Sequence, residues 1–173
     1  MVYLILTLVL LSAVHFAYEM IVAPSLRLAG RYWLFTLRDE LRTLKAAGVL
    51  EEQHFRHLED SLNALVRSFD AVNLTLLLRW RHVLRHDAAF RERVERRLRT
   101  LDECENPAAR RIRAQSVRVA VDALAINCGG GFLYLMPVLL LVRGFSTAKG
   151  LVRSLASIPE SDWNRVGPLR AKN

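Results

Sequence analysis

The sequence predicts an all-α membrane protein in which one N-terminal transmembrane helix carries a cytoplasmic helical bundle. Three observations lead to this prediction. Residues 2–23 form a long apolar run with a single formal charge. The residues that follow place apolar side chains at helical spacing. The 173-residue chain combines 52% hydrophobic with 24% charged residues, so the two kinds must be segregated, and its length suffices for a real core.

Residues 1–24 are predicted to be a membrane anchor. About 20 apolar residues, at ~1.5 Å per residue, match the ~30 Å hydrocarbon core of a bilayer. No basic residue precedes the run and no A-x-A site follows it, so we expect a retained helix and not a cleaved signal peptide. Arg27 and Arg31 come after the run, which predicts a bacterial inner-membrane protein with its N-terminus outside and its bulk in the cytoplasm.

His15 and Glu19 are four residues apart and therefore share one face of the predicted anchor helix. Ionisable groups within a bilayer usually face a protein interior or water, so this stripe could line a pore or contact another helix. Alternatively, Glu19 lies near the cytoplasmic interface and reaches the lipid headgroups.

A second helix is expected over 26–47, because Pro24 and Ser25 can bend the chain and Gly48 can end the helix as a C-cap. Aromatic residues cluster at its start, as they often do at a membrane–water boundary, and leucines form an apolar stripe farther along. These residues are Tyr32, Trp33 and Phe35, followed by Leu37, Leu41 and Leu44.

The clearest pattern is an apolar stripe with alternating spacings of three and four, which predicts one helix of roughly 50 Å from about Glu51 to Arg85. The heptad period is typical of helices that pack in bundles and coiled coils, including between subunits. The stripe consists of Phe55, Leu58, Leu62, Leu65, Phe69, Val72, Leu76, Trp80 and Val83.

Two further helices complete the predicted cytoplasmic body over 25–118. Asp87 is a candidate N-cap for a helix with a narrow apolar edge, and Asn106-Pro107 is a strong N-cap and N1 pair for the next. The apolar edge consists of Phe90, Val94, Leu98 and Leu101.

Residues 119–142 form a second apolar segment, interrupted by three glycines and Pro137. Each half is about 15 Å long as a helix, too short to cross a bilayer alone. The segment is therefore a hairpin, part of the core, or a second span, and residues 143–173 are expected to be a basic C-terminal tail.

The net charge of +8 is concentrated in residues 79–118, which carry twelve arginines against six acidic residues. Arginine binds phosphates and carboxylates with a planar fork, so RNA, anionic lipid or an acidic protein could be the partner. The candidate contacts are Arg93, Arg96, Arg97, Arg110, Arg111 and Arg113.

Arg81 and His86 have the spacing of a metal-independent ribonuclease motif, in which histidine acts as the base and arginine stabilises the phosphorane. About two such pairs are expected by chance in a chain this rich in arginine. A spacing of five also turns the two side chains to different faces of a helix. The alternative is that Arg81 and His86 lie at the solvated end of a helix. The sequence predicts no cofactor and no metal site.

The stretches "RYWLFTLRDELRTL" and "GVLEEQHFRHLEDSLNALV", after an anchor and before an Arg-x4-His pair, resemble the membrane accessory protein of type VI-B CRISPR systems. This resemblance implies a HEPN-like body, a ring-shaped homo-oligomer whose N-terminal helices line a pore, and a role in antiphage defence. It also makes Arg81 and His86 the candidate HEPN pair.

The sequence is compatible with three functions. The first is an oligomeric membrane protein that forms a pore or perturbs the bilayer. The second is a membrane-tethered ribonuclease or RNA-binding module, and the third is an anchor or scaffold for an acidic partner.

Overall fold

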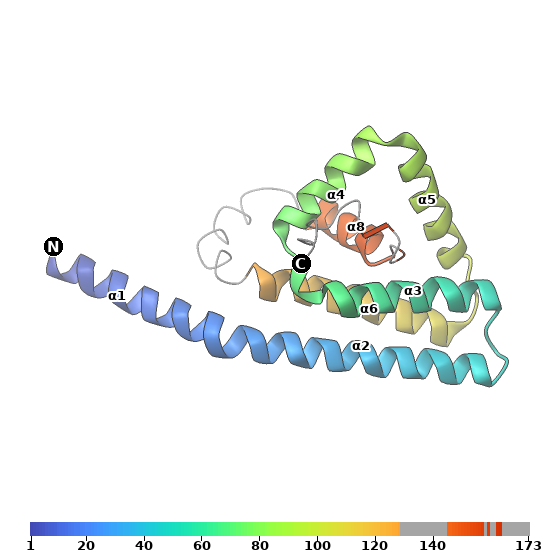
Figure 1. Ribbon diagram of the computed structural model, residues 1–173, viewed down its shortest axis with the longest axis horizontal. Helices are drawn as coiled ribbons and strands as arrows, with labels where there is room; N and C mark the ends of the chain where they lie inside the picture. Colours follow the sequence, from blue (N-terminus) through green and yellow to red (C-terminus); the bar gives the residue numbers. More distant parts are fainter. Residues whose placement is uncertain (129–144, 158, 160–161, 164–173) are drawn as a thin grey trace, which may run out of the picture.

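The computed structural model describes residues 1–128, 145–157, 159 and 162–163. Every element in this part of the chain is helical, which confirms the predicted all-α class (Figure 1). The helices are α1 (Val2–Ala17), α2 (Ala23–Ala46), α3 (Glu52–Ser68), α4 (Leu74–His86), α5 (Ala88–Asp102), α6 (Pro107–Asn127) and α8 (Phe145–Leu155). A π turn at Tyr18–Val22 joins α1 to α2, and a 3₁₀ turn at Phe69–Ala71 follows α3.

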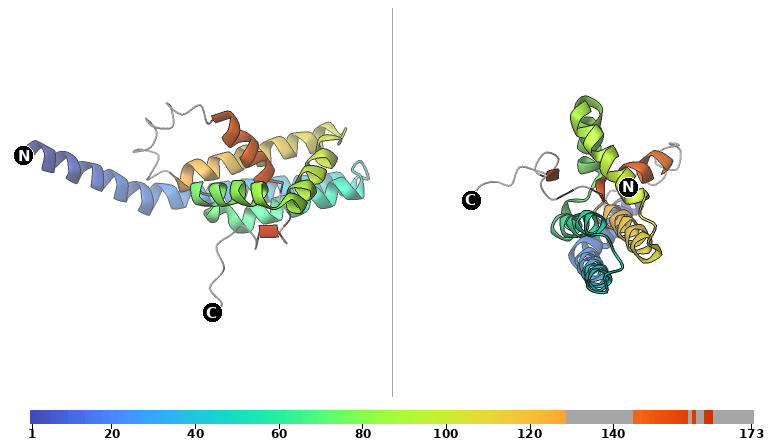
Figure 2. Two further views of the ribbon diagram at one scale, coloured as in Figure 1. Left: turned by 90° about the horizontal axis from the view of Figure 1, so that it is seen from above. Right: turned by 90° about the vertical axis from the view of Figure 1, so that its right-hand side faces the viewer.

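The first two helices form one uninterrupted rod of 45 residues, Val2–Ala46. Its first half projects beyond the body, and its second half lies along α3 and α6 (Figures 1 and 2). No residue of α1 is buried, whereas α2 buries Leu34, Leu37 and Leu41 in the core. The α1 half of the rod is therefore exposed, and the α2 half is packed against the body.

The helix does not break at Pro24 but passes through this residue, so that α1 and α2 form one rod that changes direction near the π turn (Figure 1). The Ala23 N–H donates to the Tyr18 carbonyl, five residues back, as in a π turn. This wider turn relieves the contact that a proline ring would otherwise make with the carbonyl four residues before it. The second helix expected over 26–47 is therefore present as part of α2, but it continues from the anchor helix without a break.

Gly48 ends α2 as predicted. Its φ is 69°, in the left-handed region that favours glycine. The Gly48 N–H donates to the Lys45 carbonyl (3.0 Å) and the Val49 N–H to the Leu44 carbonyl (3.3 Å). This pair of hydrogen bonds is the Schellman arrangement, which satisfies carbonyls at the end of a helix.

The single helix predicted from Glu51 to Arg85 is instead two helices, α3 and α4, which meet at an angle (Figure 1). Asn73 begins α4, because its Oδ1 accepts a hydrogen bond from the Leu76 N–H (2.9 Å). The apolar stripe nevertheless faces the core of its own chain, so it is not free for subunit packing. Its fully buried members are Leu58, Leu62, Leu65, Phe69, Val72, Leu76 and Trp80.

Both predicted N-caps after α4 are confirmed. Asp87 Oδ1 accepts from the Phe90 N–H at 2.8 Å. Asn106 Oδ1 accepts from the N–H groups of Ala108 and Ala109 at 2.9 and 3.1 Å. The apolar edge of α5 is also buried, and the Phe90 ring meets the Trp80 ring at 84°, with the centroids 5.3 Å apart.

Residues 145–157 are part of the folded body, not a tail. Helix α8 contacts α4 and α6, and Val152, Leu155 and Ala156 are buried. The Trp80 Nε1–H donates to Ser154 Oγ at 2.8 Å, so the largest core side chain is satisfied from α8. The basic residues of 143–173 led to the prediction of a tail, although Val152, Leu155 and Ala156 form a short apolar edge.

The apolar segment 119–142 is described only in its first part, which completes α6. Val119, Ala120 and Ala123 are buried there, as expected for a core segment. The glycine break and Pro137 lie outside the described residues.

Candidate functional sites

Helix α1 is an exposed apolar surface. The large hydrophobic side chains of α1, from Val2 to Phe16, are between 39% and 85% exposed. Within the described part of the chain, the rod Val2–Ala46 is the one helix long and apolar enough to cross a membrane, and the mean hydropathy of its most apolar 18-residue window is 2.0. An apolar surface of this size in water is unfavourable, so α1 requires lipid or another helix around it.

A polar cluster joins this helix to the body, and we call it the anchor junction (Tyr18, Glu19, Arg27 and Asn127). The Tyr18 hydroxyl donates to the Ile126 carbonyl at 3.1 Å, and Arg27 Nε donates to Asn127 Oδ1 at 2.8 Å. Asn127 Nδ2 in turn donates to the Phe69 and Val72 carbonyls, at 2.7 and 3.0 Å. One side chain at the end of α6 thus binds both the rod and the turn after α3.

The stripe of His15 and Glu19 lies on the same side of the rod as the anchor junction, because Glu19 pairs with Arg27, which binds Asn127. Glu19 forms an ion pair with Arg27 at 3.8 Å, two helical turns along the same rod. The His15 side chain is half-buried. Glu19 therefore has a partner within its own chain.

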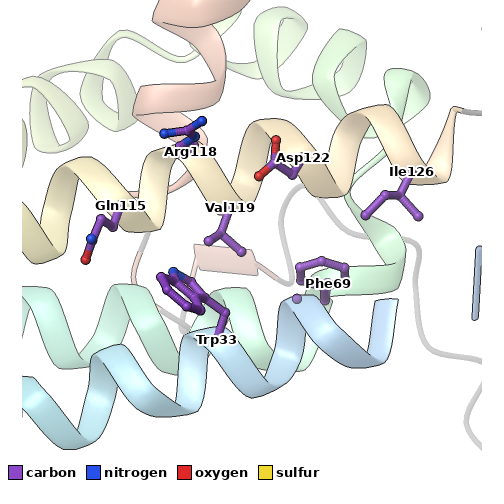
Figure 3. Close-up of a pocket in the computed structure, with 8 residues that line it drawn as sticks. Trp33, Phe69, Gln115, Arg118, Val119, Asp122 and Ile126 are labelled. Carbon is purple, nitrogen blue, oxygen red and sulfur yellow. The ribbon is translucent and has the colours of Figure 1, made fainter. Parts of the chain in front are cut away.

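Gly30 allows α2 to approach the body closely. A Cβ built at this position would lie 2.3 Å from Phe69 Cζ and 2.8 Å from Phe69 Cε2. Beside this contact is a hollow of about 250 Å³ between α2 and α6, lined by Trp33, Arg118 and Asp122 among others (Figure 3). Tyr32 and Trp33 remain exposed, and Phe35 is half-buried.

Arg81 and His86 are not brought together. Arg81 lies within α4 and His86 is the last residue of this helix, and a spacing of five along a helix directs side chains to different faces. His86 Nδ1 is 2.8 Å from the His82 carbonyl, and its ring stacks on His82 with centroids 4.1 Å apart. No contact between Arg81 and His86 occurs in the part of the chain that the structure describes. The ribonuclease role of this pair stays a prediction.

The six candidate arginines separate into three environments. Arg93, Arg96 and Arg97 come from α5 and line one hollow together with residues of α3. Arg110 and Arg111 are exposed on α6, and Arg111 pairs with Glu40. Arg113 is buried. Of these six arginines, the three from α5 line a common hollow among the described residues.

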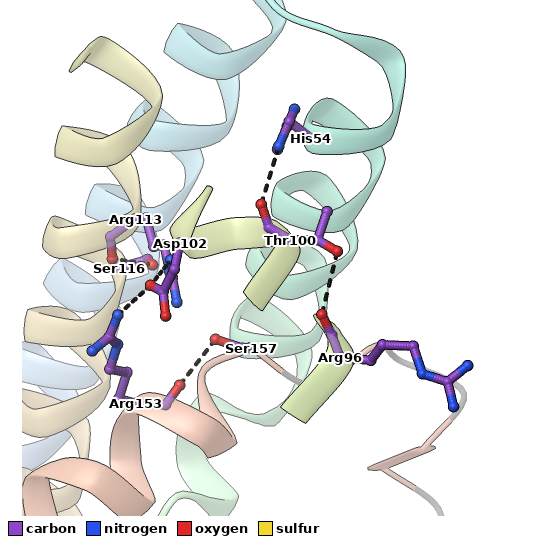
Figure 4. Close-up of polar contacts among 8 residues, drawn as sticks. All are labelled: His54, Arg96, Thr100, Asp102, Arg113, Ser116, Arg153 and Ser157. Carbon is purple, nitrogen blue, oxygen red and sulfur yellow. Dashed lines mark hydrogen bonds and ion pairs between the residues drawn. The ribbon is translucent and has the colours of Figure 1, made fainter. Parts of the chain in front are cut away.

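Arg113 belongs to a structural cluster that sequence reasoning did not reveal. Its Nη1 donates to Asp102 Oδ1 at 2.5 Å, and Arg153 from α8 donates to the same oxygen (Figure 4). Burial lowers the pKa of Arg113, and the Asp102 carboxylate opposes this effect. The cluster holds α5, α6 and α8 together.

Arg97 is also mostly buried, with 12% of its side chain exposed. Its Nη2 donates to the His57 carbonyl at 2.8 Å and to Ser61 Oγ at 3.3 Å, and it lies 3.7 Å from Asp60. Burial lowers the pKa of Arg97, and burial together with the Arg97 charge lowers the pKa of His57. His57 is therefore neutral near pH 7 beside a fixed cation.

Among the described residues, no group of three or more His, Cys, Asp and Glu side chains could hold a metal ion. Cys104 is buried and Cys128 half-buried, both as free thiols.

Comparisons with family models, curated proteins and solved structures found no match to this chain. The HEPN-like body and the resemblance to the type VI-B CRISPR accessory proteins stay predictions.

Proposed function

We propose that this protein is a single-pass membrane tether that holds an arginine-rich helical body at the cytoplasmic face of a bacterial inner membrane, where it recruits an anionic partner. The observation that carries the proposal is the 45-residue rod, exposed and apolar in its first part and buried in the body in its second. Bilayer lipid covers such a surface over about 20 residues.

The anchor junction supports a tether more directly than a pore. A pore that used the His15 and Glu19 stripe would need the Glu19 carboxylate to face a lumen. In the structure this carboxylate pairs with Arg27, and its neighbours Tyr18 and Asn127 fix the rod to α6. The stripe thus faces the side of the rod where the body attaches.

Orientation follows from the basic residues. Arg27 and Arg31 come directly after the apolar half of the rod, and basic residues near a span remain in the cytoplasm. The body that follows carries the rest of the positive charge, which suits a cytoplasmic location and an anionic partner.

The first experiment compares Leu8→Arg/Leu11→Arg with the single variant Val49→Arg. All three positions are exposed apolar residues, but Val49 lies beyond the rod. Two arginines in the span cost about 5–7 kcal/mol of insertion free energy. We expect wild type and Val49→Arg to resist carbonate extraction and the double variant to be released. A wild-type protein that carbonate releases would overturn the tether.

Protease protection then tests the orientation. Digestion of the body in inverted vesicles but not in intact spheroplasts is the expected result. The opposite pattern would contradict the cytoplasmic placement.

The pore proposal is tested separately by the oligomeric state. Native mass of the detergent-solubilised protein shows whether the exposed surface of α1 is covered by other copies. A monomer would exclude a ring, and the tether does not require one.

A further inference from the structure

The second hollow lies between α5, the N-terminal half of α3 and the segment after α8, and we call it the arginine hollow. Its volume is about 300 Å³, at the lower end of the range for small-ligand sites. Figure 4 shows three of its lining residues, Arg96, Thr100 and Ser157, in their surroundings. The full lining comprises Gln53, His57, Arg93, Val94, Arg96, Arg97, Thr100, Ser157, Pro159 and Asp162.

Three arginines line this hollow, together with one acidic residue, Asp162. Arg93 lies over the Phe90 ring, 5.5 Å from its centroid, and is otherwise exposed. Arg96 is exposed and pairs with Glu92 at 2.9 Å. Exposed pairs of this kind contribute little energy, so both side chains can turn to a ligand at small cost.

Arg97 supplies the fixed part of the site. Its hydrogen bonds to the His57 carbonyl and Ser61 hold the guanidinium in place. Its Nε is buried without a hydrogen-bond partner among the described residues, and its nearest carboxylate, that of Asp60, is half-exposed at 3.7 Å. A buried cation with incomplete acceptors attracts an anion.

We propose that the arginine hollow binds the phosphoryl group of a small phosphate monoester from the cytoplasm. One preorganised arginine and two adjustable ones can surround such a dianion with charge-assisted, bidentate hydrogen bonds. The hollow is large enough for one such group with a small substituent, and His57 and Gln53 also line it.

A small ligand fits this surface better than a nucleic acid strand. The outer face of α5 alternates its arginines with Glu92 and Glu95, which pair with Arg96 and Arg91. A polyanion that followed the helix would meet these carboxylates. Lipid headgroups of the same bilayer are also remote, because α5 lies at the end of the body farthest from α1 (Figure 1). The site therefore does not depend on the proposed tether.

The test measures binding to the full-length, detergent-solubilised protein by calorimetry at constant ionic strength. The probes are glycerol 3-phosphate, inorganic phosphate, sulfate and a single-stranded RNA oligonucleotide. Arg93→Gln/Arg96→Gln removes the two adjustable cations. Arg91→Gln/Arg99→Gln is the matched control, since it removes the same charge from exposed positions of α5 outside the hollow.

We expect both phosphates to bind wild type and the control alike, and to bind Arg93→Gln/Arg96→Gln at least about tenfold more weakly, as expected for a lost charge-assisted hydrogen bond. Sulfate should bind more weakly than glycerol 3-phosphate. Equal losses in both double variants would indicate general electrostatics and overturn the site. RNA binding without phosphate binding, or no binding of any probe, would overturn it as well.

Discussion

Replacement of Gly30 by alanine offers a sharp test of how the rod meets the body. At an exposed position in a helix, glycine to alanine stabilises a protein by about 0.5–1 kcal/mol. At Gly30 the new Cβ would lie 2.3 Å from Phe69 Cζ, far inside the 3.5–4.0 Å at which carbon atoms attract. Phe69 is 1% exposed, so its ring cannot turn into solvent.

The two effects can be compared in magnitude. Overpacking a buried site costs about 1–3 kcal/mol, and a clash with a buried aromatic ring belongs to the upper half of that range. After subtraction of the helix-propensity gain, Gly30→Ala should lower the free energy of unfolding by about 1–2 kcal/mol. For a chain of this length the midpoint of thermal unfolding should fall by on the order of 2–8 °C.

The assay is unfolding in detergent, followed by circular dichroism, with two controls. Ala29→Gly, at the exposed neighbouring helix position, measures helix propensity alone and should destabilise. Phe69→Leu removes the ring atoms that clash, so in that background Gly30→Ala should become neutral or stabilising. A stabilising Gly30→Ala in the wild-type background would refute the close packing of α2 against Phe69.

Three further predictions concern the junction, a cap and a histidine. Asn127→Ala removes hydrogen bonds to the Phe69 and Val72 carbonyls and should cost about 2–3 kcal/mol of unfolding free energy in urea titrations; an unchanged midpoint would contradict the junction. Asp87→Ala should cost about 1 kcal/mol and Asp87→Asn much less, because the asparagine oxygen still caps α5. Since the pKa of His57 is lowered in the folded protein, stability should fall as pH decreases below about 6.5, where the unfolded histidine takes up a proton. His57→Gln should remove that part of the pH dependence, and an identical profile would exclude the effect.

Local features of the fold could be predicted from the sequence, because each depends on neighbouring residues. Gly48, Asp87 and Asn106 cap helices as expected, and the apolar stripe from Phe55 to Val83 is directed to the core. The continuity of helices could not be predicted in the same way. The rod continues through Pro24 because a π turn precedes this residue. The heptad stripe continues from α3 to α4 although the two helices are separate and Asn73 caps the start of α4.

For the candidate site too, one part could be predicted from the sequence and another could not. Charge along the sequence indicated the arginines of α5 and α6, but burial decides which of them are available. Arg113 is used in the core with Asp102, whereas Arg93 and Arg96 remain exposed around a hollow. Contacts between distant segments, such as those of Asn127 with Arg27 and Phe69, could not be predicted from the sequence, in which Asn127 is only a polar residue within the apolar segment 119–142.

The uninterrupted rod also has a mechanical consequence. The 24 residues of α2 extend about 36 Å beyond the π turn, at ~1.5 Å per residue. A change of 10° in the tilt of the rod would therefore displace the far end of the body by about 6 Å. Helix tilt responds to bilayer thickness, so a thinner or thicker membrane would change the position of the arginine hollow relative to the membrane surface.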